Sequence, residues 1–348
     1  MSFSSFDASG VGIHNGNYFG FPWTPAESEI VIVNVPWDAT TSYRRGTAAG
    51  PEAMVQASTQ LDFYSFDVPG SGIIQIGTDR TMEADITTLN HRAGALSAEV
   101  IRQLESGADP TDPALSESAH QVNRLSEELD QMVYRRCQYW LQKGKQVIVA
   151  GGEHSVPLGF IRALTETCPS FGILQFDAHA DLRDAYEGFL QSHASIMFNV
   201  MQQGLAEKLV QVGIRDVSEP EMKLAAKDPR ISVFSDFDLH QYRFAGGSWF
   251  EQCRDIVSCL PEQVYISFDI DGLDPSLCPN TGTPVPGGLI LDEAMYLIRM
   301  VAESGRKIIG ADLCEVAPGT GDWDSSVGAR VLYRMACLMH HTHYPTTA

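Results

Sequence analysis

The segment Ser170–Asp184, "SFGILQFDAHADLRD", joins an apolar run directly to a polar one. The apolar part indicates a buried β-strand. After it, Asp177, His179 and Asp181 stand at every second position, with alanine between them. Along an extended strand these alternate side chains point the same way. Because carboxylates at the end of a buried strand are costly to desolvate, we expect a positive group to lie beside them.

Seven further short apolar runs are rich in Val and Ile and are mostly continuous, which is typical of parallel strands covered on both faces. The runs, including the first, are 29–35, 72–77, 146–152, 171–177, 209–214, 231–235, 263–271 and 307–313. Helical segments are expected between them, at 90–104, 113–143, 157–166, 195–203, 249–258, 292–304 and 325–341. Strands that alternate with helices predict an α/β fold with a parallel sheet and right-handed crossovers.

The chain is predicted to hold a single α/β domain over residues 29–348, because no repeat, low-complexity tract or linker interrupts it. Residues 1–28, rich in glycine and aromatic side chains, are expected to form an irregular N-terminal extension. The 348 residues are 44% hydrophobic, which is enough for a substantial core.

Composition narrows the classes of partner. Lys and Arg total 24 against 44 Asp and Glu, a formal charge of −20, which argues against binding to nucleic acid or to anionic membranes. No signal peptide is evident, and no apolar run approaches the roughly 20 residues of a membrane span. Seven scattered cysteines without CxxC pairs indicate reduced thiols. We therefore predict a cytoplasmic protein that binds neither nucleic acid nor membranes, although composition does not by itself identify a substrate.

Four polar clusters follow predicted strands: "GGEHS" (151–155), "FDAHADLRD" (176–184), "SFDIDGLDP" (267–275) and "ADLCEVAP" (311–318). In open parallel sheets, ligands bind beyond the carboxyl ends of the strands. Although these clusters are distant in sequence, the fold should gather them along one edge.

The gathered side chains predict a site for two divalent cations. They are four carboxylates and two imidazoles: His154, Asp177, His179, Asp181, Asp269 and Asp271. This set of nitrogen and oxygen donors favours Mn²⁺ and also accepts Fe²⁺, Co²⁺ or Ni²⁺. Water between two such ions becomes hydroxide near neutral pH and attacks an electrophilic carbon. Each motif alone is equally typical of a turn or a cap, so the prediction depends on finding all three at strand ends.

Taken together, the motifs resemble those of the ureohydrolases, the arginase and agmatinase superfamily, and the chain is most similar to its agmatinase-like branch. "GGEHS", "FDAHADLR", "SFDIDGLDP" with the following "TGTPVPGGL", and "EVAP" match in order and spacing over roughly 146–318. The resemblance implies a three-layer α/β/α sandwich around a mainly parallel sheet of about eight strands. It also implies two metal ions, usually manganese, and hydrolysis at a guanidino or amidino carbon.

The resemblance implies a role for each matching residue. One metal would be bound by His154, Asp177, Asp181 and Asp269, and the other by His179, Asp177, Asp269 and Asp271. Asp177 and Asp269 would bridge the ions, and Asp181 would also orient the hydroxide. Glu315 would pair with the substrate guanidinium. His193 would be the proton shuttle to the departing amine. Relatives commonly form trimers or hexamers, so we expect a homo-oligomer.

The sequence departs from both known branches where the substrate tail should bind. "SHASIM" replaces the His-Gly-Thr of agmatinases, and "LRDAYEGFLQ" replaces the Asn-rich loop with which arginases hold a carboxylate. Asp216 resembles an acidic position that meets a substrate amine in some relatives, although a role at a helix N-terminus is an equal interpretation. Arg44, Arg45 and Arg183 are candidates for lining the pocket and binding a carboxylate, with solvated loop residues as the alternative interpretation.

The leading hypothesis is hydrolysis of a guanidino compound to urea and an amine, with agmatine as the first candidate substrate. Within the same class, 4-guanidinobutyrate or another guanidino acid, free guanidine, arginine and formimidoylglutamate stay open. A hypothesis of a different class is a metal-binding homologue without catalytic activity. The complete ligand set, with His193 and Glu315 present, favours the enzyme.

Overall fold

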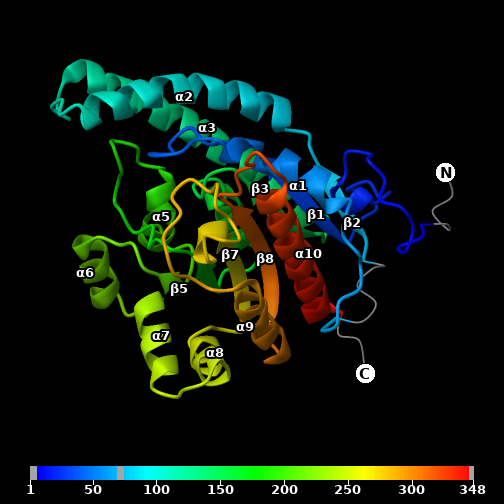
Figure 1. The fold of residues 1–348 in the computed structure, drawn as a ribbon. Helices are drawn as coiled ribbons and strands as arrows, with labels where there is room; N and C mark the ends of the chain where they lie inside the picture. Colours follow the sequence, from blue (N-terminus) through cyan, green and yellow to red (C-terminus); the bar gives the residue numbers. More distant parts are fainter. Residues whose placement is uncertain (1–5, 69–73, 345–348) are drawn as a thin grey trace.

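The computed structural model describes residues 6–68 and 74–344, and it contains a central sheet of eight strands (Figure 1). All strand pairs are parallel, in the order β2-β1-β3-β8-β7-β4-β5-β6. This confirms the predicted fold class. The strands are β1 (Ile30–Val35), β2 (Ile76–Asp79), β3 (Gln146–Gly151), β4 (Gly172–Phe176), β5 (Lys208–Ile214), β6 (Ile231–Ser235), β7 (Gln263–Asp269) and β8 (Lys307–Cys314).

Two predicted strands differ from the structure. The run 72–77 was expected to be a strand, but β2 begins only at Ile76, and residues 72 and 73 lie outside the described part of the chain. The strand predicted over 263–271 is two residues shorter in the structure: β7 stops at Asp269, and a short 3₁₀ turn, Ile270–Gly272, follows. The Asp269 side chain accepts a hydrogen bond from the Asp271 backbone N–H at 2.9 Å, which caps this turn.

Ten α-helices flank the sheet in the described residues. They are α1 (Gly50–Ser58), α2 (Glu83–Glu105), α3 (Pro113–Gln142), α4 (Leu158–Thr167), α5 (Ile196–Gln202), α6 (Glu219–Lys227), α7 (Asp236–Phe244), α8 (Trp249–Ser258), α9 (Leu291–Glu303) and α10 (Trp323–His343). All seven predicted helical segments are helical. Helices α1, α6 and α7 were not predicted. Helix α7 buries little more than Leu239, and α6 buries Glu221 and Ala225, so both lack an apolar stripe.

The helices form a layer on each side of the sheet. Alternate side chains of one strand enter different cores: Ile30 and Ile32 belong to the core that includes α9 and α10, whereas Val31 and Val33 belong to the core that includes α2 and α3. Helices α1, α8, α9 and α10 share the first core, and α2, α3, α4 and α5 share the second. The result is a three-layer α/β/α sandwich, in which both faces of the strands are covered.

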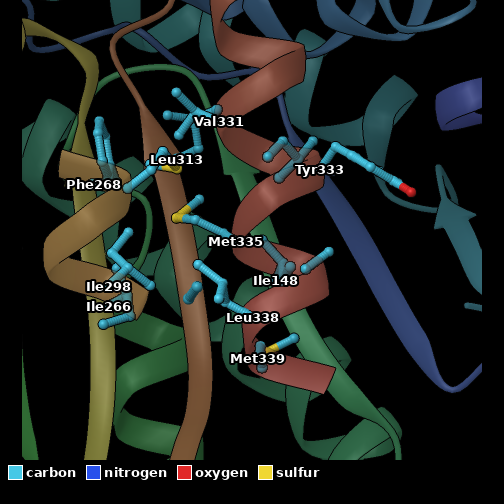
Figure 2. Close-up of a cluster of buried hydrophobic side chains, with 14 of the residues drawn as sticks. Ile148, Ile266, Phe268, Ile298, Leu313, Val331, Tyr333, Met335, Leu338 and Met339 are labelled. Carbon is cyan, nitrogen blue, oxygen red and sulfur yellow. The ribbon is translucent and has the colours of Figure 1, made fainter. Parts of the chain in front are cut away.

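Helix α10 shows how one layer is held (Figure 2). Its Val331, Met335 and Leu338 are buried against the sheet, where Leu313 of β8 and Phe268 of β7 are also buried. Full burial of each such side chain contributes about 1.5–3 kcal/mol. The packing therefore fixes the two central strands that end at the polar clusters.

The described part of the N-terminal extension packs onto the domain. Tyr18, Phe19 and Phe21 are fully buried or nearly so. The Tyr18 hydroxyl donates to Asn34 Oδ1 of β1 at 3.0 Å. Residues 1–5 lie outside the described chain. The division of the chain into an irregular extension of residues 1–28 and a single domain over residues 29–348 stays a prediction.

Among the helices that the structure describes, none combines the length and the apolar character needed to cross a bilayer.

The four strands that precede the polar clusters, β3, β8, β7 and β4, are neighbours at the centre of the sheet. Parallel strands present their carboxyl ends at one edge, so this order brings the four clusters together.

Candidate metal centre and active-site cavity

A first group of ligand side chains surrounds the Nδ1 atom of His154, directly after β3. This atom lies 3.0 Å from Asp177 Oδ2, 3.0 Å from Asp181 Oδ2 and 3.4 Å from Asp269 Oδ2. All four residues are buried. His154, Asp177 and Asp181 have ligand atoms close enough together to hold one metal ion.

A second group surrounds the Nδ1 atom of His179. This atom lies 3.1 Å from Asp271 Oδ2 and 3.5 Å from Asp177 Oδ1. Asp177, His179 and Asp271 again have ligand atoms close enough to hold an ion. The two groups share Asp177, whose two oxygens face different histidines. The structure thus brings predicted ligand residues into two adjacent groups with Asp177 in common. Asp269 lies beside His154 and belongs to neither group, so its bridging role and the ligand assignment stay predictions.

The pKa shifts of the candidate ligands are compatible with bound cations. Burial raises the pKa of Asp269 well above its usual range, and Asp271 and Asp177 raise it further. Burial and the charge of Asp177 raise the pKa of Asp181 to about 7. Burial opposes charge on His154, but hydrogen bonds to Asp177 and Asp181 still raise its pKa well above the usual value. In this arrangement protons on imidazoles neutralise the crowded carboxylates, and two divalent cations would neutralise them more completely.

Behind His154, polar groups fix the orientation of the imidazole ring. Its Nε2 atom lies 2.8 Å from Ser267 Oγ of β7 and 3.7 Å from Asp312 Oδ1 of β8. Both partners are fully buried. With Nε2 engaged in this way, Nδ1 is directed at the three carboxylates. Such outer partners of a ligand histidine select its tautomer and raise its basicity.

Glu153 connects the turn that carries His154 to the segment after β1. Its carboxylate accepts hydrogen bonds from Trp37 Nε1 at 3.1 Å, from the Thr40 backbone N–H at 2.7 Å and from Thr40 Oγ1 at 2.6 Å. Ser155 Oγ donates as well, at 2.6 Å. Burial raises the pKa of Glu153 to about 7 despite these donors. Glu153 therefore ties two loops of the site together without pointing into it.

His193 lies beside that same segment, just before α5. Its Nε2 atom is 3.3 Å from Ser42 Oγ, and its Nδ1 atom is 3.3 Å from Ser192 Oγ. The His193 backbone N–H donates to Thr40 Oγ1 at 3.2 Å. Burial lowers the pKa of His193 to about 4, and the charge of nearby His179 contributes. The neutral imidazole is the form that accepts a proton, but a pKa of about 4 makes it a weak base, because efficient acid–base catalysis requires a pKa near the working pH.

Glu315 follows β8 and is buried next to the metal ligands. Its Oε1 accepts a hydrogen bond from the His154 backbone N–H at 2.9 Å. A Cβ atom placed on Gly282 would lie 3.2 Å from Glu315 Oε2, so the glycine leaves that oxygen room. Burial raises the pKa of Glu315, and the charge of Glu153 adds to this effect. Glu315 thus lies deep in the cluster and not in the wall of the open cavity described next.

Two of these residues have strained backbones. Asp181 has φ = 54° and Glu315 has φ = 63°, in the left-handed region that non-glycine residues seldom adopt. Such conformations cost about 1–3 kcal/mol each and concentrate at functional sites. Here they follow strand ends and aim carboxylates at the cluster.

A cavity of about 140 Å³ opens beside the cluster. Five predicted residues line it: His179, Asp181, Arg183, His193 and Asp216. Arg44 and Arg45 are not in its wall. Five further residues complete the wall: Ser42, Tyr186, Ala194, Glu221 and Thr283. The sequence reasoning did not identify Ser42, Tyr186, Glu221 or Thr283. A signal existed for Ser42, because "NVPWDATTSY" is a fifth polar segment after a predicted strand. Glu221 gave none, since its spacing from Ser218 is that of an ordinary helix capping box.

The outer rim of the cavity carries charges of both signs. Asp216 is largely exposed, with 71% of its side chain accessible, and its Oδ2 lies 3.9 Å from His179 Nε2. It precedes helix α6, which begins at Glu219 with Ser218 as its N-cap, so the alternative interpretation as a helix-terminal acid does not describe its position. Arg183 Nε lies 3.7 Å from Glu221 Oε2, and its guanidinium stacks over the Tyr186 ring at 4.6 Å.

The fold and this arrangement define a class: an α/β enzyme with a buried cluster of carboxylates and histidines that could hold metal ions, at the carboxyl ends of the central strands. The sequence profile of the Arginase family matches residues 28–337. The chain belongs to the arginase family, and it is an amidinohydrolase acting on linear amidine C–N bonds.

Individual relatives differ in what they act on. The chain is 29% identical to an N(1)-aminopropylagmatine ureohydrolase from Synechocystis, over 89% of each chain. It is 28% identical to a guanidinopropionase from Pseudomonas aeruginosa, over 90% of this chain and 88% of the relative. Its fold is similar to that of the proclavaminate amidino hydrolase from Streptomyces clavuligerus, with a TM-score of 0.71, 22% identity and coverage of 96% and 100%.

Proposed function

We propose that the protein is a binuclear metal-dependent hydrolase that releases urea and an amine from a guanidino compound, with agmatine as the first candidate substrate. The observation that carries the proposal is the joint geometry of five of the six candidate ligand residues: two groups of donor atoms share Asp177 beside an open cavity, and Asp269 lies 3.4 Å from His154. The names of two relatives, an N(1)-aminopropylagmatine ureohydrolase and a guanidinopropionase, refer to guanidino compounds and support the same class of substrate.

The donor set favours Mn²⁺, with Ni²⁺, Co²⁺ or Fe²⁺ as alternatives. One ion would be held by His154, Asp177, Asp181 and Asp269, and the other by His179, Asp177, Asp269 and Asp271. The ions would supply Lewis-acid charge that lowers the pKa of water between them and so provides a nucleophile. The chain's own residues would supply the rest: orientation, charge recognition and proton transfer.

Three residues carry these roles. Asp181 would orient the attacking water by accepting its hydrogen bond. Glu315, with one oxygen facing the space beside Gly282, would pair with the planar guanidinium of the substrate. His193 lines the cavity in its neutral form, so it would take up a proton and deliver it to the leaving amine. The order of these groups, from buried cluster to rim, sets the direction in which the substrate lies.

The rim favours a substrate with a cationic tail. Arg183, the positive group of the cavity wall, faces Glu221 and the Tyr186 ring. The Asp216 side chain is more exposed, and in the described part of the chain its ion-pair contact is with His179 at 3.9 Å. With His179 neutral as a metal ligand, the negative charge of Asp216 would complement the terminal ammonium of agmatine.

A substrate with a carboxylate tail is the second candidate. Arg183 is 40% exposed and lies in the cavity wall, where it could turn from Glu221 to a carboxylate. Such a substrate would be 3-guanidinopropionate or 4-guanidinobutyrate. The two candidate substrates place tails of opposite charge at the same rim, so comparing kcat/KM for the two kinds of substrate distinguishes between them.

The test is a substrate panel with protein loaded separately with Mn²⁺ and Ni²⁺. The panel holds agmatine, N(1)-aminopropylagmatine, the two guanidino acids, arginine, free guanidine and formimidoylglutamate, with urea and formamide as the products assayed. We expect urea, with the highest kcat/KM for agmatine. A preference for a guanidino acid would transfer the tail-binding role to Arg183. Absence of both products with both metals would refute the hydrolase proposal.

A further inference from the structure

A second cavity lies on the other side of the loop that borders the active site. It has a volume of about 240 Å³ and is formed by the end of α2, the start of α3 and the turn at residues 186–189. In Figure 1 this loop, drawn in green before α5, rises toward the paired helices α2 and α3. The lining residues are Val100, Leu104, Pro110, Leu115, Ser116, Ala119, Glu187 and Gly188.

The cavity contains one carboxylate that lacks a hydrogen-bond partner. Glu187 Oε2 is shielded from solvent and has no partner among the residues that the structure describes. Burial raises the pKa of Glu187 to about 7, and the neighbouring charge of Glu105 adds to this. A buried carboxylate oxygen without a donor is costly. The site is therefore acidic and unsatisfied, within walls that are mainly hydrocarbon.

The backbone holds Glu187 in this position against its own preference. Glu187 and Gly188 both have positive φ, 54° and 83°. The backbone N–H groups and carbonyls of Tyr186 and Phe189 pair at 3.2 and 2.8 Å across this two-residue turn. Turns of this kind favour Asn and Gly. Asn123 of α3 anchors the turn by donating to the Gly188 carbonyl at 3.0 Å and accepting from the Leu190 N–H at 2.8 Å.

The same turn reaches the active site. Tyr186, adjacent to Glu187, lines the first cavity, and its ring lies edge-on to the His193 ring with centroids 6.2 Å apart. The two cavities thus lie on opposite sides of one short loop. A ligand bound at Glu187 would restrict the turn that positions Tyr186.

We propose that this second cavity binds a small primary ammonium ion with a short apolar tail, through Glu187 Oε2 and the aliphatic walls. The ammonium would donate the hydrogen bond that Glu187 lacks, and Val100, Leu104 and Leu115 would cover the tail. A divalent metal ion does not fit, because it requires several oxygen donors, and the lining offers one carboxylate and the Ser116 hydroxyl. The proposal goes beyond the hydrolase function and concerns binding alone.

The probe is 4-bromobenzylammonium, soaked into crystals of the metal-loaded full chain. We expect an anomalous bromine peak between α2 and α3, with the ammonium beside Glu187. In solution, calorimetry should detect a binding event that E187Q weakens at least about tenfold, since the ammonium then meets a neutral amide oxygen instead of a charged carboxylate. Ser116→Phe, which fills the cavity without altering the turn, should abolish the same event. E128Q, an exposed change on α3, is the matched control and should retain it.

Three results would overturn the proposal. One is the absence of bromine from this cavity in the wild-type crystals. Another is equal affinity of E187Q and E128Q in a protein whose folding is verified by circular dichroism. The third is occupation of the cavity by a lysine of a neighbouring molecule, which would make it a contact between copies of the chain. None of these results depends on enzymatic turnover. If the second cavity binds no ammonium ion, the proposed hydrolase function is therefore unaffected and is tested by the substrate panel.

Discussion

The floor and the rim of the candidate active site are built in different ways. The floor consists of side chains at the ends of β3, β4, β7 and β8, and its metal-ligand candidates are almost all buried. The rim consists of the loop after Asp181 and the segment around Asp216, where side chains are half exposed and charges of both signs meet. The position of the floor residues follows from the sheet, whereas the rim depends on loops that no strand constrains.

This difference separates reaction class from substrate choice. Side chains at the ends of adjacent central strands cannot move apart without disrupting the sheet, so a change in the rim can alter the substrate without altering the floor. Function in a shared fold resides in such local sites. The two named relatives, one an aminopropylagmatine ureohydrolase and the other a guanidinopropionase, have nearly the same identity to this chain. Overall similarity therefore does not choose the substrate.

The largest effect is expected from a change in the floor, Asp269→Ala. The variant should bind fewer metal ions than the wild type and lose activity by at least about 100-fold, the upper range seen even for outer partners of ligands. The reason is that Asp269 is assigned to both ions. Metal analysis after dialysis and a urea assay provide the measurement.

Thermal unfolding sharpens this test. Burial and acidic neighbours raise the pKa of Asp269, so its charge is unfavourable in metal-free protein. Asp269→Ala should therefore unfold no more easily than wild type without metal, yet gain less Tm when Mn²⁺ is added. Asp274→Asn, in the exposed turn after β7, is the control and should respond like wild type. Full metal content in Asp269→Ala would disprove the assignment of this ligand.

A smaller effect is expected where floor meets rim, at His193. His193→Ala should lower kcat by about 10²–10⁴-fold, the usual contribution of a positioned acid or base, while metal content stays that of wild type. Kinetics and metal analysis of the same sample decide the point. His240→Ala, on the surface helix α7, is the matched control. If His193→Ala lost metal, His193 would be a ligand and not a proton shuttle.

The floor was predictable from sequence because its signals are periodic and local. Asp177, His179 and Asp181 could be assigned to one site from alternate spacing after a strand. The other four, His154, Asp269, Asp271 and Glu315, follow predicted parallel strands, whose carboxyl ends share one edge of the sheet, and the structure places them nearby. The left-handed backbones of Asp181 and Glu315 were not predictable, since they are set by neighbouring strands and by close packing.

The residues of the rim could not be predicted from the sequence, because loop folding brings them to the cavity. Tyr186 and Glu221 are brought to the cavity by a tight turn and by the start of α6, and neither has a spacing that reports a site. The contact of Ser42 with His193 spans 151 positions of the chain. Such contacts depend on how loops fold over the finished sheet, so they appear only in three dimensions.

The smallest effect, and the one that bears most directly on the substrate, is expected for Asp216→Asn at the rim. Because 71% of this side chain is exposed, water and salt screen its charge. We expect the KM for agmatine to rise only about three- to tenfold, with kcat within about twofold, and the increase to shrink at high ionic strength. The KM for 4-guanidinobutyrate should not rise, because its tail has the same charge as Asp216. Asp184→Asn, exposed on the neighbouring loop, is the control for a general change in surface charge. An equal rise in KM for both substrates would show that Asp216 shapes the cavity without reading the charge of the tail, and specificity would then lie with Arg183.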